Sequence, residues 1–236
     1  VITAAGSASQ VVAAAVALAR VARDRIDLRA QRGAHPRIGA LDVLPFVPLR
    51  DAGLDDAVTL AHRAAERIWR ELGIPSYLYG AAASASQRRN LADVRRGEFE
   101  ALWQRAREPA WAFDYGDAPH ASAGAIAIGA RPFLIAFNVE LDSPDLGTAR
   151  AIARLLRERD GGLRTLKALG IRLTPAIVQV SFNVTDVDAV PLYRVRELVR
   201  LAAERRGARV RRSELIGLAP RRAIERTARA YETKSL

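Results

Sequence analysis

Cysteine is absent from this chain of 236 residues, and lysine occurs only as Lys167 and Lys234. Without cysteine the chain can form no disulfide, no thiol nucleophile and no thiolate metal site, and this fits a cytoplasmic protein. Three histidines are too few for a histidine-rich zinc site, so we expect no metal centre. No apolar run approaches the about 18 residues of a membrane-spanning helix, so we expect no membrane partner.

Arginine carries nearly all of the positive charge, and the formal net charge is +11. A basic chain suits either nucleic acid, through counterion release, or a small ligand with several carboxylates. Proteins that bind single-stranded nucleic acid combine a basic groove with exposed aromatic side chains. Here the arginines are spread over every expected helix, and aromatic residues make up only 6%. We therefore expect small-molecule substrates and no nucleic acid, with a basic nucleic-acid-binding protein as a distant alternative.

Apolar periodicity predicts alternating helices and strands along the chain. The expected helices are residues 8–31, 54–72, 145–159, 191–206 and 220–231, with short helices within 86–107. The expected strands are residues 41–49, 77–80, 125–128, 133–141, 169–173, 176–185 and 208–215. The opening run 1–5 resembles the middle of a strand, so we expect the natural chain to begin earlier.

Short strands that contain proline favour two small sandwiches over one long doubly wound sheet. Residues 176–185 have one apolar face and one largely polar face, as in an antiparallel sheet with one face covered. The second half follows the element order of a ferredoxin-like unit. We predict an α+β fold of two ferredoxin-like sandwich subdomains, spanning residues 1–131 and 132–236.

The run His35-Pro36-Arg37-Ile38-Gly39-Ala40-Leu41-Asp42 lies on a loop between an expected helix and an expected strand. His35 can move protons near neutral pH, and Arg37 can hold a carboxylate with two parallel donors. Asp42 can orient either of them or contact the substrate. These residue types suit a transferase that acts on an anionic substrate. Neither a P-loop nor a Gly-x-Gly-x-x-Gly turn after a strand is present, so we expect no dinucleotide.

Several stretches, in order along the whole chain, resemble the formiminotransferase domain of formiminotransferase-cyclodeaminases and the stand-alone glutamate formimidoyltransferases. They are residues 35–48, 77–80, 95–100, 124–131, 133–138, 179–183 and 213–220. The resemblance implies transfer of the formimino group of N-formimino-L-glutamate to N5 of tetrahydrofolate, a step of histidine degradation. It also implies a folate cleft between the two subdomains and a homodimer.

The resemblance assigns roles to particular residues. His35 matches the histidine thought to be catalytic. From their side-chain chemistry, and not from the resemblance, Arg37 and Asp42 are the expected substrate-binding residues. Two glycines suit a loop that must approach a flat pterin closely. The expected folate-binding loop is Gly116, Asp117, Ala118, Pro119, His120, Ala121, Ser122, Ala123 and Gly124.

The chain also departs from the family pattern. Ala81 follows Gly80 where the family usually has glutamate, and Ala121 follows His120 where bacterial members have proline. We expect the chain as given to lack a front segment that contributes to the family's site, as well as the cyclodeaminase domain, so that ring closure would need a separate protein. Two alternatives remain: formyl transfer between 5-formyltetrahydrofolate and glutamate, and an inactive paralogue that keeps the fold.

Overall fold

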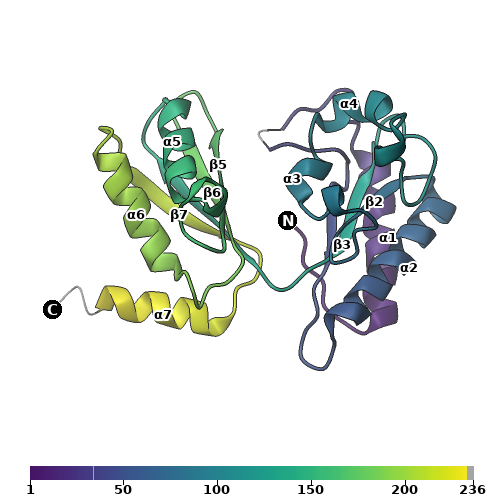
Figure 1. The fold of residues 1–236 in the computed structure, drawn as a ribbon, viewed down its shortest axis with the longest axis horizontal. Coiled ribbons are helices and arrows are strands. Elements are labelled where there is room, and N and C mark those ends of the chain that lie inside the picture. The colour runs from purple at the N-terminus through teal and green to yellow at the C-terminus, as the bar shows by residue number, and fades with distance from the viewer. Residues whose placement is uncertain (34, 233–236) are drawn as a thin grey trace. The chain divides into compact units, whose positions relative to one another are not determined.

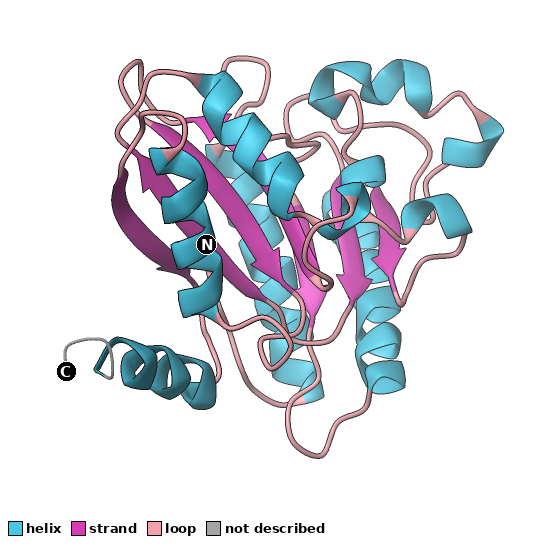
Figure 2. Ribbon diagram, turned by 60° about the vertical axis from the view of Figure 1, so that its left-hand side comes forward, coloured by secondary structure: helices cyan, strands magenta, loops and turns pink. Residues whose placement is uncertain are grey.

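The computed structural model describes residues 1–33 and 35–232, and its elements gather into two compact units (Figures 1 and 2). The N-terminal unit is Ala4–Pro132, and the C-terminal unit is the chain from Phe133 onward together with Val1–Thr3. Each unit packs helices on its own β-sheet, which confirms the predicted α+β fold of two subdomains. The opening residues form no strand, contrary to expectation. Among the described residues, no helix combines the length and apolar character needed to span a bilayer.

Three parallel strands form the N-terminal sheet, in the order β1 (Val43–Phe46), β3 (Ile126–Ala130) and β2 (Ser76–Gly80). Helix α1 (Ala8–Arg25) and helix α2 (Leu54–Leu72) pack on one face of this sheet. Successive strand residues point to opposite faces. Leu78 of β2 and Ile126, Ile128 and Ala130 of β3 are therefore buried in the core formed with these two helices.

The opposite face of the sheet carries Tyr77, Tyr79 and Ala127, which form a second core. Helix α3 (Leu91–Val94) and helix α4 (Glu98–Arg105) contribute apolar side chains to this core. Single 3-10 turns lie at Ser86–Arg88, Pro109–Trp111 and Glu158–Asp160. The short helices expected within residues 86–107 are thus formed.

The parallel sheet differs from the ferredoxin-like arrangement predicted for this half, in which neighbouring strands are antiparallel. Parallel strands require a crossover connection, and α2 supplies one between β1 and β2. The alternation of apolar residues within a strand is the same whether its neighbour runs parallel or antiparallel. Periodicity therefore identified the strands and left their direction undetermined.

The C-terminal unit is a four-stranded antiparallel sheet with helices on one face (Figure 1). Its elements are β4 (Ile135–Leu141), α5 (Leu146–Leu156), β5 (Leu166–Arg172), β6 (Val178–Val184), α6 (Leu192–Glu204), β7 (Val210–Ile216) and α7 (Arg221–Glu232). The strand order is β5-β6-β4-β7, with every pair antiparallel. This is the order and pairing of a ferredoxin-like unit. The other face is polar and includes the buried side chains of Asn138, Glu140 and Gln179.

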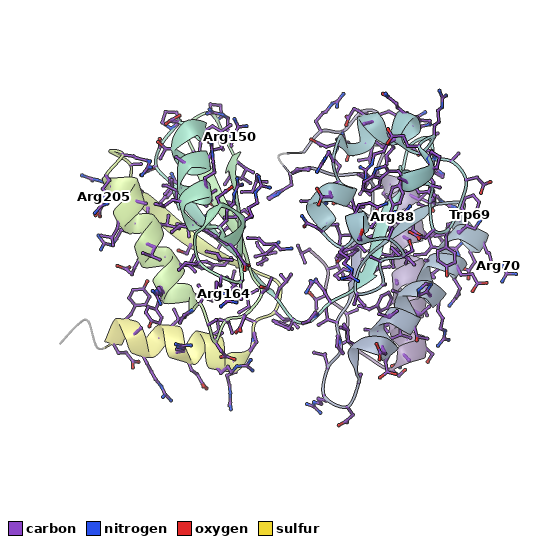
Figure 3. The ribbon with its side chains drawn as sticks, in the orientation of Figure 1. Trp69, Arg70, Arg88, Arg150, Arg164 and Arg205 are labelled. Atoms are coloured by element: carbon purple, nitrogen blue, oxygen red, sulfur yellow. The ribbon has the colours of Figure 1, made fainter. Side chains whose placement is uncertain are left out.

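Arginine side chains project from both units (Figure 3). Arg150, Arg164 and Arg205 are exposed on the C-terminal unit. Arg88 is instead buried in the N-terminal unit, where its guanidinium pairs with Asp114 at 2.7 Å. The positive charge therefore serves two purposes, because some arginines are solvated and others satisfy internal carboxylates and carbonyl groups.

Candidate active site

Backbone hydrogen bonds join the loop of residues 35–42 to the segment 116–124, both within the N-terminal unit. The Ala40 N–H donates to the Ala123 carbonyl at 3.0 Å. On the other side of the pair, the Ala125 N–H donates to the Ile38 carbonyl, also at 3.0 Å. The predicted catalytic histidine and the predicted folate loop therefore belong to directly paired segments. The sequence identified both segments but contained no sign that they touch.

Two glycines allow this close pairing. Gly39 and Gly124 form the bridge between the segments. A Cβ on Gly39 would collide with the Ala125 carbonyl oxygen, and one on Gly124 would collide with that of Ile38. Gly124 also has a φ of +68°, in the left-handed region that favours glycine. A side chain at either position would push the two segments apart.

We expect Gly124→Ala to destabilise the protein more than Gly73→Ala. Gly73 has nearly the same φ, +65°, but a Cβ there would meet nothing within 4 Å. The control should lose about 1–2 kcal/mol of unfolding free energy from its left-handed conformation alone. Gly124→Ala should lose about 1–3 kcal/mol more because of the collision. Urea denaturation of both variants measures the difference, and equal losses would contradict the close pairing.

Asp42 holds the first of the two segments in shape. Its Oδ1 accepts the Ile38 N–H at 2.8 Å, which closes the loop across four residues. Its Oδ2 pairs with the guanidinium of Arg95, which follows α3. Both side chains are largely buried, so the ion pair is only weakly screened. Asp42 and Arg95 together fix the loop that carries His35.

His35 lies near this ion pair. Its side chain is exposed at the surface, yet the protein atoms around it lower the pKa of its imidazole below the usual 6.5. Burial is the largest cause because it disfavours the charged form, and the positive charge of Arg95 adds to it. The carboxylate of Asp42 acts in the opposite direction. The result is an imidazole that is neutral at pH 7 and able to accept a proton.

Arg37 is engaged by two carboxylates. Its Nη1 lies 2.9 Å from Glu98 Oε2 and 2.8 Å from Glu100 Oε2, and its Nη2 lies 2.8 Å from Glu100 Oε1. Hydrogen bonding to Arg37 is the main reason that the pKa of Glu100 falls to about 2. The donors predicted to bind a substrate carboxylate therefore already bind carboxylates of the protein. The substrate-binding role of Arg37 stays a prediction.

His120 organises the second segment. Its N–H and carbonyl pair with the carbonyl and N–H of Gly124, each at 2.9 Å. Its Nδ1 accepts the Ala123 N–H at 3.1 Å and the Ser122 N–H at 3.4 Å. The proton of the neutral ring therefore resides on Nε2. The Nε2–H is the group that His120 can offer to a ligand.

Gly116 anchors the other end of this segment. It has a φ of +104°, and a Cβ there would lie 2.7 Å from Pro75 and 3.0 Å from Trp69. Between the two anchored ends, Asp117, Ala118 and Ala121 are exposed. The segment 116–124 is therefore fixed at both ends and open between them, as a binding loop for a flat ring requires.

Two further polar residues, Tyr79 and Arg131, lie close to Arg95 and Asp42. Burial raises the pKa of the Tyr79 phenol, while the charges of Arg131 and Arg95 lower it and that of Asp42 raises it. Sequence reasoning assigned no role to Tyr79, Arg95 or Arg131. The available signal was their position, because Tyr79 and Arg131 stand where parallel strands end, and α/β sheets bind ligands there.

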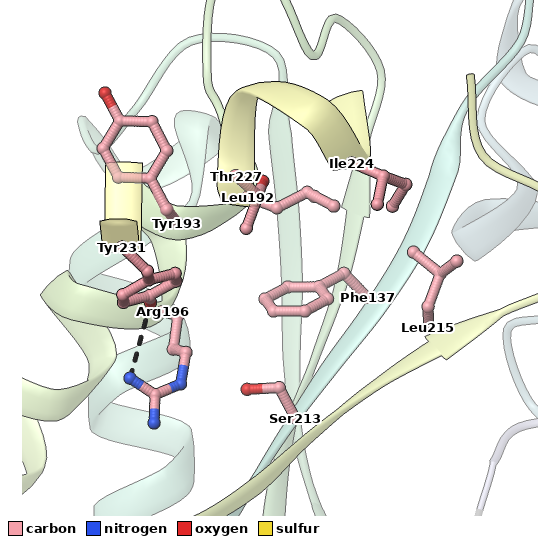
Figure 4. A pocket seen from close by; sticks show the side chains of 9 residues that line it. All are labelled: Phe137, Leu192, Tyr193, Arg196, Ser213, Leu215, Ile224, Thr227 and Tyr231. Carbon is pink, nitrogen blue, oxygen red and sulfur yellow. Dashed lines mark hydrogen bonds between the residues drawn. The ribbon is translucent and has the colours of Figure 1, made fainter. Parts of the chain in front are cut away.

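A separate cavity of about 280 Å³ lies in the C-terminal unit (Figure 4). It is lined by Phe137, Leu192, Tyr193, Arg196, Ser213, Leu215, Ile224, Thr227 and Tyr231. Arg196 Nη1 donates to Tyr231 Oη at 3.4 Å on one side of it. None of the predicted site residues lines this cavity, so the candidate active site is the paired loops of the N-terminal unit.

Comparison with known proteins relates the whole chain to one group. The glutamate formimidoyltransferase of Streptococcus pyogenes serotype M1 is 42% identical over 233 residues, covering 98% of this chain and 78% of that protein. The glutamate formimidoyltransferase of Thermoplasma acidophilum is 43% identical over 234 residues, covering 98% of this chain and 77% of that protein. The formimidoyltransferase-cyclodeaminase of Gallus gallus is 39% identical over 238 residues, covering 97% of this chain and 44% of that protein.

Family models match both halves. Residues 1–131 match the N-terminal subdomain of the formiminotransferase domain, and residues 136–235 match the formiminotransferase domain model that follows it. These matches confirm the predicted resemblance over nearly the full length. The chain belongs to the formiminotransferase family of transferase enzymes.

Proposed function

We propose that this chain transfers the formimino group of N-formimino-L-glutamate to N5 of tetrahydrofolate. The observation that carries the proposal is the direct backbone pairing of the His35 loop with the segment 116–124. Two relatives with more than 40% identity are named glutamate formimidoyltransferase. Family membership supplies the reaction class, and the paired loops supply a place where a proton-transferring group lies beside a ligand-binding loop.

The reaction is an exchange of amines at an amidine carbon. N5 of tetrahydrofolate attacks this carbon, a tetrahedral intermediate forms, and the bond to the glutamate nitrogen breaks. The attacking nitrogen loses a proton and the leaving nitrogen gains one, so no net proton is consumed. A single acid–base group can perform both transfers. The oxidation state of the carbon does not change, and the proposed mechanism uses no metal.

His35 is the acid–base group in this proposal. Its lowered pKa keeps the ring neutral at pH 7, so it can take the proton of N5 as the new bond forms. The resulting imidazolium then gives the proton to the departing glutamate nitrogen. Asp42 and Arg95 act through the loop, because they hold the backbone next to His35 in one conformation.

The segment 116–124 is the proposed folate-binding loop. Its exposed residues are small, and its two glycine ends pack tightly against the rest of the unit. The Nε2–H of His120 can donate to a carbonyl or ring nitrogen of the pterin. Tetrahydrofolate is a substrate here, since it leaves the enzyme carrying the formimino group.

The wider setting also belongs to the proposal. We place the reaction in histidine degradation, in the cytoplasm, with a cyclodeaminase consuming the product. We further propose a homodimer, as the family resemblance implies, and light scattering of the purified protein tests it.

The test is a direct assay of the purified protein. Tetrahydrofolate is titrated first, formiminoglutamate is then added, and 5-formiminotetrahydrofolate and free glutamate are followed. Formation of both products at equal, catalytic rates is the expected result. A parallel assay replaces the donor with 5-formyltetrahydrofolate and supplies glutamate as acceptor. Turnover in the second assay alone would overturn the proposal in favour of formyl transfer, and folate binding without any turnover would indicate an inactive paralogue.

A further inference from the structure

Arg131 stands at the carboxyl end of the N-terminal parallel sheet. It directly follows β3, and its N–H donates to the carbonyl of Phe46 at the end of β1, at 3.2 Å. Residues 127, 129 and 131 share one face of the sheet, because alternate strand residues point the same way. Tyr79 on β2 is paired with Gly129 and points to this face as well.

Gly129 makes room for Tyr79. A Cβ on Gly129 would lie 2.6 Å from Cδ1 and 2.7 Å from Cε1 of the Tyr79 ring, so the ring crosses β3 directly above this glycine. The Tyr79 side chain is buried, which raises the pKa of its phenol, and the positive charge of Arg131 lowers that pKa. Arg131 therefore lies on the same sheet face as a buried phenol at a defined position.

The charges around Tyr79 do not balance. Arg95 is neutralised by Asp42, and Arg37 is neutralised by two glutamates elsewhere. Within residues 1–33 and 35–232, by contrast, Arg131 has no ion pair. Its guanidinium donates from Nη1 to the Pro132 carbonyl at 3.1 Å. A half-buried guanidinium with no counter-charge and a fixed neighbour is a site for an anion.

We propose that Arg131, on the sheet face that carries Tyr79, binds a carboxylate of the amino acid part of the formimino donor. The inference rests on the proposed function, since that function supplies the donor. The chemistry fits, because formiminoglutamate carries two carboxylates and a guanidinium binds a carboxylate with two parallel donors. The site also adjoins the Asp42–Arg95 pair, which acts electrostatically on both Tyr79 and His35. The role predicted for Arg37 is thereby assigned to a different arginine.

The first test is binding of formiminoglutamate without tetrahydrofolate, so that no transfer can occur. Calorimetry compares the wild type with Arg131→Gln, Arg131→Lys and Tyr79→Phe. We expect Arg131→Gln to weaken binding about 10- to 100-fold, and Tyr79→Phe to weaken it less, because the ring that packs on Gly129 is kept. Lysine keeps the charge but not the paired donors, so Arg131→Lys should fall between the wild type and Arg131→Gln.

A matched control makes the same change of charge elsewhere. Arg63 is exposed on α2 of the same unit, and we expect Arg63→Gln to bind formiminoglutamate as the wild type does. Tetrahydrofolate affinity should stay unchanged in all of these variants. If Arg131→Gln binds formiminoglutamate within twofold of Arg63→Gln, or loses tetrahydrofolate affinity equally, the proposal is wrong.

Substrate analogues sharpen the result. N-formimino-4-aminobutanoate lacks the α-carboxylate, and N-formimino-2-aminobutanoate lacks the γ-carboxylate. The loss caused by Arg131→Gln should disappear for one of these two analogues only, and that analogue identifies the bound carboxylate. An equal loss with both analogues would overturn the assignment.

Turnover by the wild type is measured separately and distinguishes the two claims. Wild-type turnover together with unchanged binding in Arg131→Gln rejects the carboxylate site alone. Absent turnover together with weakened binding in that variant rejects the proposed transfer and keeps the carboxylate site. A wild type that does not bind formiminoglutamate rejects both.

Discussion

Replacement of His35 by alanine is expected to lower kcat by about 10²- to 10⁴-fold, the usual contribution of a general acid–base group. In the proposed mechanism this ring moves the proton both from the attacking nitrogen and to the leaving nitrogen, so both half-steps lose their catalyst. Tetrahydrofolate affinity should change little, because the backbone bonds that organise the loop do not involve the imidazole. Stopped-flow turnover and equilibrium folate titration measure the two quantities.

His120 provides the matched control for this substitution. His120→Ala removes a ring that accepts two backbone N–H bonds, so we expect weaker folate binding and a smaller loss of kcat. His35→Gln separates loss of the side chain from loss of proton transfer, since glutamine keeps a polar side chain but cannot carry a proton between the two nitrogens. Near-normal kcat in both His35 variants would show that another group performs the proton transfer.

Arg95→Gln is expected to move the pH dependence of kcat/KM to higher pH. Neutral His35 is the active form in the first step, so activity rises as pH increases through the pKa of this ring, which lies below 6.5. The positive charge of Arg95 lowers that pKa, and its removal therefore raises it. We also expect kcat at the pH optimum to fall by about 10²-fold, because the Asp42 carboxylate loses its ion-pair partner and the loop shifts.

The opposite substitution gives the opposite shift. Asp42→Asn removes a negative charge that raises the pKa of His35, so the acid limb should move to lower pH. Arg95→Lys keeps the positive charge, so the acid limb of its kcat/KM profile should stay close to that of the wild type. Arg96→Gln is the neighbouring control, since Arg96 is exposed and pairs with Asp93. Parallel shifts for Arg95→Gln and Asp42→Asn would contradict the electrostatic explanation and indicate a purely structural effect.

Local patterns were enough for elements that depend on near neighbours. Helix α2 occupies Leu54–Leu72 as predicted, and it ends at Gly73, whose φ is +65° and whose N–H bonds back to Trp69. The alternation of an apolar and a largely polar face over residues 176–185 likewise predicted strand β6. Helical periodicity, a glycine stop and period-two alternation are all visible within a short window of sequence.

Long-range pairing limited other predictions. Helix α1 was expected to reach residue 31 but ends at Arg25, after which Ile26 is extended. Two residues after Ile26, the Leu28 N–H donates to the Ser122 carbonyl at 2.9 Å, a bond to a partner distant in sequence. A backbone group that finds such a partner leaves the helix, and no local propensity predicts this outcome.

The candidate site residues also divide into those that local sequence identified and those that only long-range contacts brought together. The sequence alone determined the family, the two α+β subdomains, the loop with His35 and the glycine-bounded segment 116–124, because each depends on residue identity and order. Tertiary structure alone decided that these two segments pair, that glutamates occupy Arg37 and that Arg131 shares a sheet face with Tyr79. Such contacts join residues far apart in the chain, and they arise from the packing of the parallel sheet, which fixes which side chains meet.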